Sequence, residues 1–151
     1  MREKKITFEE VIPLVLEKLK CGGEVLFSPN GVSMLPTFKE GRDRLVLVSA
    51  PARLKKYDVA LYKRENGQYV LHRVVRVGAS YTFIGDNQLE YEKGIGSEQI
   101  IALCSAYIRA GKRVSLDSFR ARSFARFWHY TRFWRRLCRK IRSILKRIFK
   151  K

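Results

Sequence analysis

The sequence is short of the features that mark several common protein classes. Its three cysteines, Cys21, Cys104 and Cys138, are odd in number and widely spaced, which fits neither a disulfide framework nor a zinc pattern. Such thiols are typical of a protein kept reduced in the cytosol. No apolar run reaches the length of a signal-peptide core or a membrane-spanning helix, because Val11–Leu16 is short and contains Pro13. We therefore expect a cytoplasmic protein with no spanning segment.

Acidic residues are nearly absent from the C-terminal end of the chain. Residues 1–116 carry 19 lysines and arginines and 13 acidic residues, whereas residues 117–151 carry 13 basic residues and one acid, Asp117. The formal charge of +18 therefore comes mainly from the tail. We predict three parts: an N-terminal helix over residues 1–23, a main domain over residues 24–115 and a basic tail over residues 116–151.

The pattern of apolar residues predicts a mainly β domain. Apolar residues at helical spacing from Phe8 to Leu19 predict one helix, which Gly22-Gly23 ends. After it come the predicted strands, which are Glu24–Phe27, Arg44–Val48, Asp58–Lys63, Tyr69–Val77, Tyr81–Ile84 and Ile100–Ile108. Asn66-Gly67 is a strong hairpin signal. Because no helix separates the strands, we expect a small antiparallel sheet curled into a barrel.

Helical periodicity returns at about Leu116. No Gly or Pro interrupts residues 114–151, so a single helix of about 30 residues is predicted. Its apolar stripe consists of Phe124, Phe127, Trp128, Thr131, Trp134, Leu137, Cys138, Ile141, Ile144, Leu145 and Ile148, and basic residues that include Arg135 and Arg136 fill most of the other face. Such a helix suits an anionic membrane surface. Nucleic acid and docking on the main domain are alternatives, and the regular stripe with two tryptophans favours the membrane.

Ser33 is the candidate nucleophile. It lies in the loop Asn30–Thr37 between two predicted strands, where a turn can present its hydroxyl to a substrate. A serine hydroxyl needs a general base. Of the two histidines, His129 lies among the arginines of the tail, so His72 is the candidate base, and Asp86 is the candidate acid that orients its ring. Taken singly, each also fits a structural role, as a loop serine, a buried strand histidine and a turn aspartate.

Together these segments resemble a known family. Residues 31–37, 56–62, 70–75 and 85–87 are similar, in order and spacing, to the nucleophile box and three later segments of signal peptidases and LexA-like repressor peptidases. The resemblance covers residues 24 to about 113. His72 stands where most bacterial members have lysine, which resembles the endoplasmic-reticulum and archaeal signal peptidases.

The resemblance implies a small antiparallel barrel-like fold and a Ser-His-Asp site with Ser33 as nucleophile, His72 as general base and Asp86 as supporting acid. It also implies an oxyanion donor in the Ser33 backbone N–H, with Gly31 and Met34 in the oxyanion and substrate region. Gly31 stands where signal peptidases can have a serine that adds a second donor. Lys63 and Lys93 are alternative bases outside the matching place.

We therefore predict a serine endopeptidase that needs no metal or cofactor. Its substrate would be an extended peptide or precursor leader with small side chains beside the cleaved bond. The basic tail predicts a peripheral protein on the inner face of the cell membrane, in which Phe124, Phe127, Trp128, Trp134, Ile141, Arg135 and Arg136 meet the lipid. A catalytically silent peptide- or membrane-binding homologue and a nucleic-acid-binding protein are the alternatives.

Overall fold

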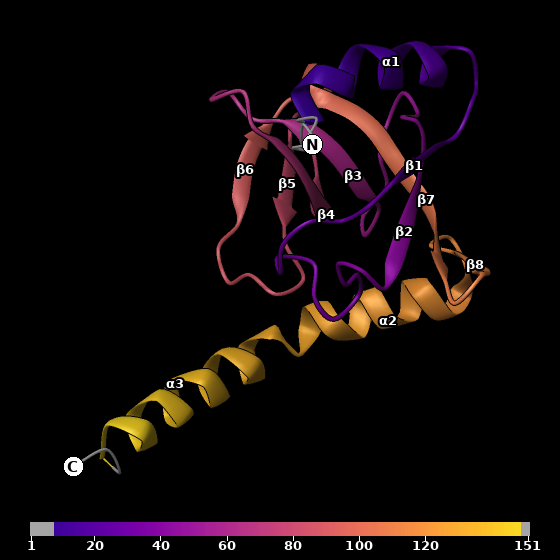
Figure 1. Ribbon diagram of the computed structural model, residues 1–151. Coiled ribbons are helices and arrows are strands. Elements are labelled where there is room, and N and C mark those ends of the chain that lie inside the picture. Colours follow the sequence, from indigo (N-terminus) through magenta and orange to yellow (C-terminus); the bar gives the residue numbers. More distant parts are fainter. Residues whose placement is uncertain (1–7, 149–151) are drawn as a thin grey trace, which may run out of the picture.

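The chain folds around one antiparallel sheet, with one helix before it and two after it (Figure 1). The computed structural model describes residues 8–148. In chain order the elements are α1 (Phe8–Lys20), β1 (Val25–Phe27), β2 (Asp43–Ser49), β3 (Val59–Lys63), β4 (Tyr69–Val77), β5 (Tyr81–Ile84), β6 (Glu92–Ile95), a 3-10 turn (Ser97–Gln99), β7 (Ile100–Arg109), β8 (Lys112–Ser115), α2 (Phe119–Tyr130) and α3 (Arg132–Ile148). The predicted mainly β architecture is confirmed.

The sheet is open. Its strand order is β1-β2-β7-β3-β4-β5-β6, with β8 paired to β7, and every pairing is antiparallel. Within residues 8–148 the two terminal strands, β1 and β6, do not pair with each other, so the expected closure into a barrel is not reached. Register shifts interrupt four of the pairings, and such bulges bend and twist a sheet.

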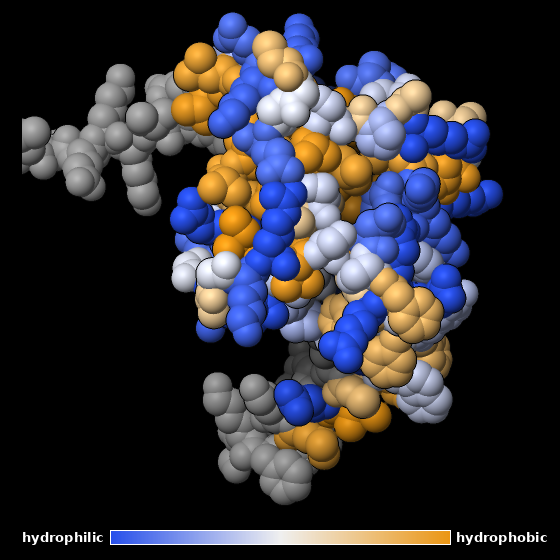
Figure 2. Space-filling view, turned by 90° about the vertical axis from the view of Figure 1, so that its right-hand side faces the viewer, coloured by the Kyte–Doolittle hydropathy of each residue, from blue (hydrophilic) through white to orange (hydrophobic). Residues whose placement is uncertain are grey.

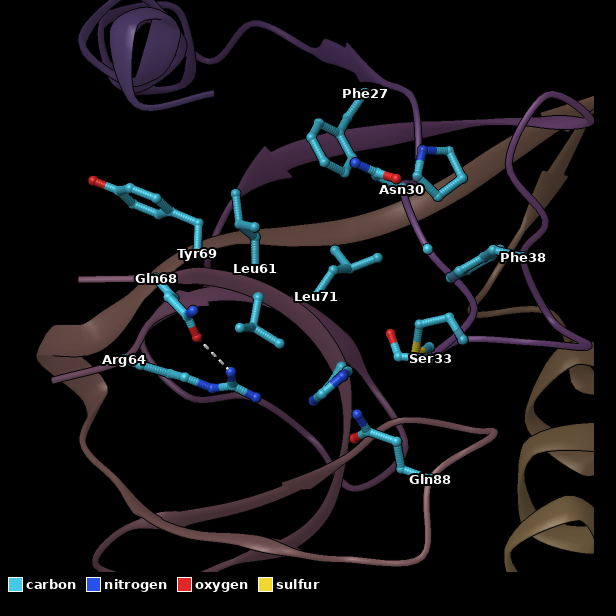
Figure 3. Close-up of a pocket in the computed structure, with 15 residues that line it drawn as sticks. Phe27, Asn30, Ser33, Phe38, Leu61, Arg64, Gln68, Tyr69, Leu71 and Gln88 are labelled. Atoms are coloured by element: carbon cyan, nitrogen blue, oxygen red, sulfur yellow. Dashed lines mark hydrogen bonds between the residues drawn. The ribbon is translucent and has the colours of Figure 1, made fainter. Parts of the chain in front are cut away.

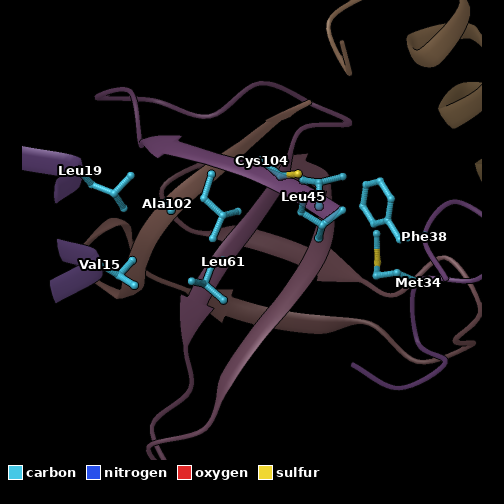
Figure 4. Close-up of a cluster of buried hydrophobic side chains, with 10 residues drawn as sticks. Val15, Leu19, Met34, Phe38, Leu45, Leu61, Ala102 and Cys104 are labelled. Carbon is cyan, nitrogen blue, oxygen red and sulfur yellow. The ribbon is translucent and has the colours of Figure 1, made fainter. Parts of the chain in front are cut away.

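Both faces of the sheet are apolar, because its central strands are buried on both sides. Successive side chains of β3 point to opposite faces: Val59 and Leu61 belong to one cluster of buried side chains, and Ala60 and Tyr62 belong to the other. Figure 4 shows the first cluster, where α1 contributes Val15 and Leu19, and the loop after β1 contributes Met34 and Phe38. The segment that carries Ser33 is therefore anchored in the main core by its own side chains.

The prediction of one uninterrupted tail helix is wrong, because the helix breaks at Thr131. At this break the Trp128 carbonyl accepts hydrogen bonds from the Thr131 hydroxyl (3.3 Å) and from the Arg135 side chain, and such side-chain bonds compete with the backbone bonds of a helix. In Figure 1, α2 runs along the lower edge of the sheet and α3 continues away from the domain. Neither these helices nor any other part of residues 8–148 forms a helix long and apolar enough to cross a membrane.

Candidate functional site

Ser33 and His72 line the same cavity. It has a volume of ≈ 600 Å³ and lies between the loop after β1 and the β3–β4 hairpin. In Figure 3 the Ser33 side chain is turned into this space, across from Leu71, and Arg64 and Gln88 lie at its lower rim. The structure thus brings together the predicted nucleophile and the predicted base.

The Ser33 loop is held in place by the turn after β5. The backbone N–H of Asn87 donates to the Ser33 carbonyl at 2.8 Å, and the Asn87 side-chain amide donates to the Val32 carbonyl at 3.1 Å. Gly85 permits this close approach, because a Cβ at that position would lie 2.7 Å from the Ser33 carbonyl oxygen. Gly31, with φ +79°, supplies a backbone conformation at the start of the loop that other residues rarely adopt.

A carboxylate orients the His72 ring, and it belongs to Glu92. His72 is 1% exposed, and its Nδ1 lies 3.2 Å from Glu92 Oε1 and 3.3 Å from the Tyr62 hydroxyl. The Tyr62 hydroxyl donates its proton to Glu92 Oε2 at 2.8 Å, so it does not donate to His72 Nδ1. The arrangement therefore favours a proton on Nδ1 directed at Glu92, which leaves the Nε2 lone pair as an acceptor.

Burial keeps this histidine neutral. It lowers the pKa of His72 from 6.5 to about 4, although the charge of Glu92 acts in the opposite direction. Burial alone would raise the pKa of Glu92, but hydrogen bonds from Arg64 and Tyr62 lower it, so the carboxylate stays ionised. Arg64 holds Glu92 through two nitrogens, one of them 2.8 Å from Oε2. At neutral pH the site thus contains a neutral imidazole beside a fixed negative charge.

Asp86 has a different partner from the one predicted. Its carboxylate accepts from Arg73 Nε at 2.8 Å and Arg73 Nη2 at 2.7 Å, and also from the Thr37 hydroxyl. Burial alone would raise the pKa of Asp86, but its bonds to Arg73 and Thr37 lower it. Because Arg73 follows His72 in β4, the two side chains leave opposite faces of the strand. Asp86 lies on the face of Arg73. The carboxylate beside the His72 ring is therefore that of Glu92, and Asp86 ties the Ser33 loop to β4.

The other predicted residues of the site are distributed as follows. Gly31 and Met34 both line the cavity; the Gly31 amide donates to Glu40 Oε2 at 3.2 Å, and the Met34 side chain is buried. Within the described part of the chain the Ser33 amide makes no hydrogen bond, so it can serve as a donor to a ligand. Lys63 and Lys93 are exposed and lie outside the lining of the cavity.

Some of the tail residues predicted to meet a membrane contact the domain instead, and others are exposed. Trp128 docks on the domain, since its indole N–H donates to the Asp86 carbonyl at 2.8 Å, and Arg135 donates to the same carbonyl at 3.2 Å. The others point away from the core: Phe124, Phe127, Trp134 and Ile141 are exposed. The side chain of Arg136 lies outside the described part of the structure.

Comparison of the chain with protein-family models, curated proteins and solved structures found no match. Among the described residues, no group of three or more histidine, cysteine, aspartate or glutamate side chains could hold a metal ion.

Proposed function

We propose that the protein is a serine endopeptidase in which Ser33 is the nucleophile and His72 the general base. One observation carries this proposal: the buried, neutral His72 shares a cavity with Ser33, and its Nδ1 is engaged by Glu92. A nucleophile, a base and a third group that orients the base form the arrangement that activates a serine hydroxyl. The resemblance to signal peptidases and LexA-like peptidases supports the same roles for Ser33 and His72 and a related fold, whereas the third residue that it implies is Asp86 and not Glu92.

In this mechanism Ser33 Oγ attacks the peptide carbonyl while His72 Nε2 takes the hydroxyl proton. Glu92 stabilises the imidazolium that forms, and the Ser33 amide donates to the developing oxyanion. The imidazolium then gives the proton to the leaving amine, which leaves an acyl group on Ser33. Water, activated by the same imidazole, hydrolyses that ester and restores the free enzyme. Every proton transfer uses one histidine nitrogen, so no metal is needed.

The substrate we propose is an extended peptide or the leader of a precursor protein. The cavity continues from Ser33 along Phe27, Leu61, Tyr69 and Leu71, so one wall is apolar. Beside it lies β1, the terminal strand of the sheet. A peptide that lies along this strand would bring its scissile bond to Ser33. Small side chains next to that bond would fit, as the family resemblance implies.

The proposal is tested with an active-site probe and with cells. A fluorophosphonate should label the wild-type protein and not the Ser33→Ala protein, and His72→Ala should abolish the labelling with the fold retained. Ser28→Ala, an exposed serine in the same loop, is the control and should label normally. Comparing protein termini in cells that carry wild-type or Ser33→Ala protein would then identify the substrate. Labelling that survives His72→Ala would show that the protein is not this kind of peptidase.

We also propose that the tail attaches the protein to an anionic membrane surface. On α3 the side chains of Leu137, Ile141 and Leu145 recur at helical spacing, and each is at least 40% exposed. Residues 117–151 contain a single acidic residue, so an acidic lipid surface complements the charge of this segment. In Figure 2, hydrophobic side chains stand among charged ones at the lower end of the molecule, where the tail lies.

Sedimentation with vesicles tests this attachment. The full-length protein should pellet with vesicles that contain phosphatidylglycerol and stay in solution with neutral vesicles. Replacing Leu137, Ile141 and Leu145 together by glutamine should release it, because the apolar contribution to binding is lost while the charge is kept. Unchanged pelleting of that variant would contradict the proposed role of α3. Tighter binding to duplex DNA than to vesicles would favour the nucleic-acid alternative.

A further inference from the structure

The Ser33 loop supplies one clear donor for an oxyanion. The charge that develops on a carbonyl oxygen is stabilised by preorganised donors aimed at the place where it forms. The Ser33 amide is such a donor, since it makes no hydrogen bond in the described part of the chain. Gly31 has no side chain, and its amide donates to Glu40 Oε2 at 3.2 Å. A second donor therefore has to come from another segment that lines the cavity.

The polar side chains that line the cavity differ in what they can donate. The guanidinium nitrogens of Arg64 already donate to neighbouring side chains. In Figure 3, Asn30 and Gln68 lie in other parts of the cavity, whereas Gln88 lies directly below Ser33. Gln88 is therefore the side chain best placed to supply the second donor.

The carboxamide of Gln88 is held by its oxygen. Its Oε1 accepts from the Gly85 amide at 3.3 Å, and because that N–H needs an acceptor, the contact fixes which way the carboxamide is turned. The Gln88 amide donates to the Gly85 carbonyl at 2.9 Å, so the residue closes a tight turn. Its Nε2 makes no hydrogen bond within residues 8–148, and the residue is half-buried in the wall of the cavity. The two N–H groups of this carboxamide are thus available to a ligand.

The turn that holds Gln88 also holds the nucleophile. A Cβ placed on Gly85 would lie 2.7 Å from the Ser33 carbonyl oxygen and 2.9 Å from Gln88 Oε1, so both atoms flank one point. The Asn87 amide donates to the Ser33 carbonyl at 2.8 Å. The Gln88 carboxamide is therefore fixed beside the backbone of Ser33 before any substrate binds.

We propose that Gln88 Nε2 is the second oxyanion donor of the candidate active site. As Ser33 Oγ bonds to the peptide carbonyl carbon and His72 Nε2 takes the hydroxyl proton, the π electrons of the carbonyl become a lone pair on its oxygen. The Ser33 amide and the Gln88 carboxamide donate to that oxygen. The carbonyl re-forms when the amine leaves with the proton from the imidazolium. This inference rests on the proposed peptidase function and adds a residue that touches the reacting atoms.

Three variants of the full-length protein separate this role from a structural one. Gln88→Ala removes the donors together with the acceptor for the Gly85 amide, whereas Gln88→Glu keeps an acceptor and removes the donors. Gln99→Ala is the matched control, because Gln99 Oε1 accepts from the Gly96 amide at 2.8 Å in the same arrangement but lies outside the lining of the cavity. The assay is the maximal rate of fluorophosphonate labelling of Ser33, with urea unfolding in parallel. In this reaction Ser33 Oγ bonds to phosphorus, fluoride leaves and the hydroxyl proton is released.

Both Gln88 variants should label on the order of 100-fold more slowly than the wild type, because each lacks one oxyanion donor. Gln99→Ala should label at the wild-type rate. Slow labelling of Gln88→Ala with normal labelling of Gln88→Glu would show that only the acceptor for the Gly85 amide matters, and it would overturn the proposal. Wild-type rates in both Gln88 variants would overturn it as well.

The phosphonylated protein gives a second readout, because its phosphonyl oxygen stays where the oxyanion forms. The side-chain amide ¹⁵N–¹H signals of Gln88 should shift between the free and the labelled protein, and those of Gln99 should not. The chain has three glutamines, so Gln88→Ala and Gln99→Ala assign these signals. Unmoved Gln88 signals in the labelled protein would refute the role. If the wild-type protein is not labelled at all, the peptidase function itself fails, so the two failures are distinguishable.

Discussion

Replacing Glu92 by glutamine isolates the contact that the structure adds to the predicted site. The change keeps the size of the side chain and removes the charge that lies 3.2 Å from His72 Nδ1. A hydrogen bond to a charged partner contributes about 1.5–3 kcal/mol. Both partners of that contact are charged only when His72 is protonated, as it is in the transition state. The substitution therefore destabilises the transition state more than the resting enzyme. We expect Ser33 reactivity to fall about 10- to 100-fold.

The fold should survive this substitution. The Arg64–Glu92 pair is partly exposed, at 32% and 22% for the two side chains, so its loss should lower the free energy of unfolding by less than about 1 kcal/mol. The assay is the rate of fluorophosphonate labelling of Ser33, with urea unfolding in parallel. Glu90→Gln, an exposed neighbour, is the control for charge and should label at the wild-type rate. A Glu92→Gln protein that labels at the wild-type rate would refute the role assigned to this carboxylate.

Three further predictions follow from the surroundings of the site. Asp86→Asn should lower the free energy of unfolding by about 3–5 kcal/mol in urea, because it leaves Arg73 buried without its anion; an unchanged midpoint would contradict this. Labelling of Ser33 should fall only as pH drops through about 4, the pKa of His72, and stability should fall as pH decreases from 6.5 to about 4, because the unfolded chain binds the proton first; a midpoint of labelling near 6.5 would show that the ring is solvated. Gly85→Ala should slow labelling while circular dichroism stays unchanged, because its Cβ would lie 2.7 Å from the Ser33 carbonyl oxygen; normal labelling would mean that the loop can yield without cost.

The strands with strong periodicity could be predicted from the sequence, and the two weak ones could not. Asn66-Gly67 marks the β3–β4 turn, where Gly67 has φ +86° and its amide donates to the Arg64 carbonyl. By contrast, β6 and β8 are polar or contain glycine, with the sequences Glu-Lys-Gly-Ile and Lys-Arg-Val-Ser. These segments become strands because they pair with β5 and β7, respectively. Such pairing depends on the neighbouring strand and not on the residues of the segment itself, so the local sequence does not reveal it.

The same limit explains why the sequence does not point to Glu92 as the neighbour of His72. Glu92 lies in a polar segment with no periodic signal, and only the pairing of β6 with β5, in which Phe83 faces Glu92, brings its carboxylate beside Tyr62. The sequence points to Asp86 because this residue follows a predicted strand in the turn Gly85-Asp86-Asn87. Only the structure shows that Asp86 pairs with Arg73, whose side chain leaves β4 on the face opposite to that of His72.

The turn formed by residues 85–87 connects the Ser33 loop with the tail helices. Its amide and side chain at Asn87 hold the Ser33 loop, and its carboxylate at Asp86 pairs with β4. Its backbone carbonyls face the other way and accept hydrogen bonds from Trp128, Arg132 and Arg135 of the tail. The Ser33 loop and the tail therefore bond to the same turn, whereas the His72 ring contacts Glu92 and Tyr62, for which no hydrogen bond or ion pair with the tail is found within residues 8–148. If the tail attaches to a membrane as proposed, a pull on α3 would act first on the turn that holds the Ser33 loop, and the contacts of His72 with Glu92 and Tyr62 would stay in place.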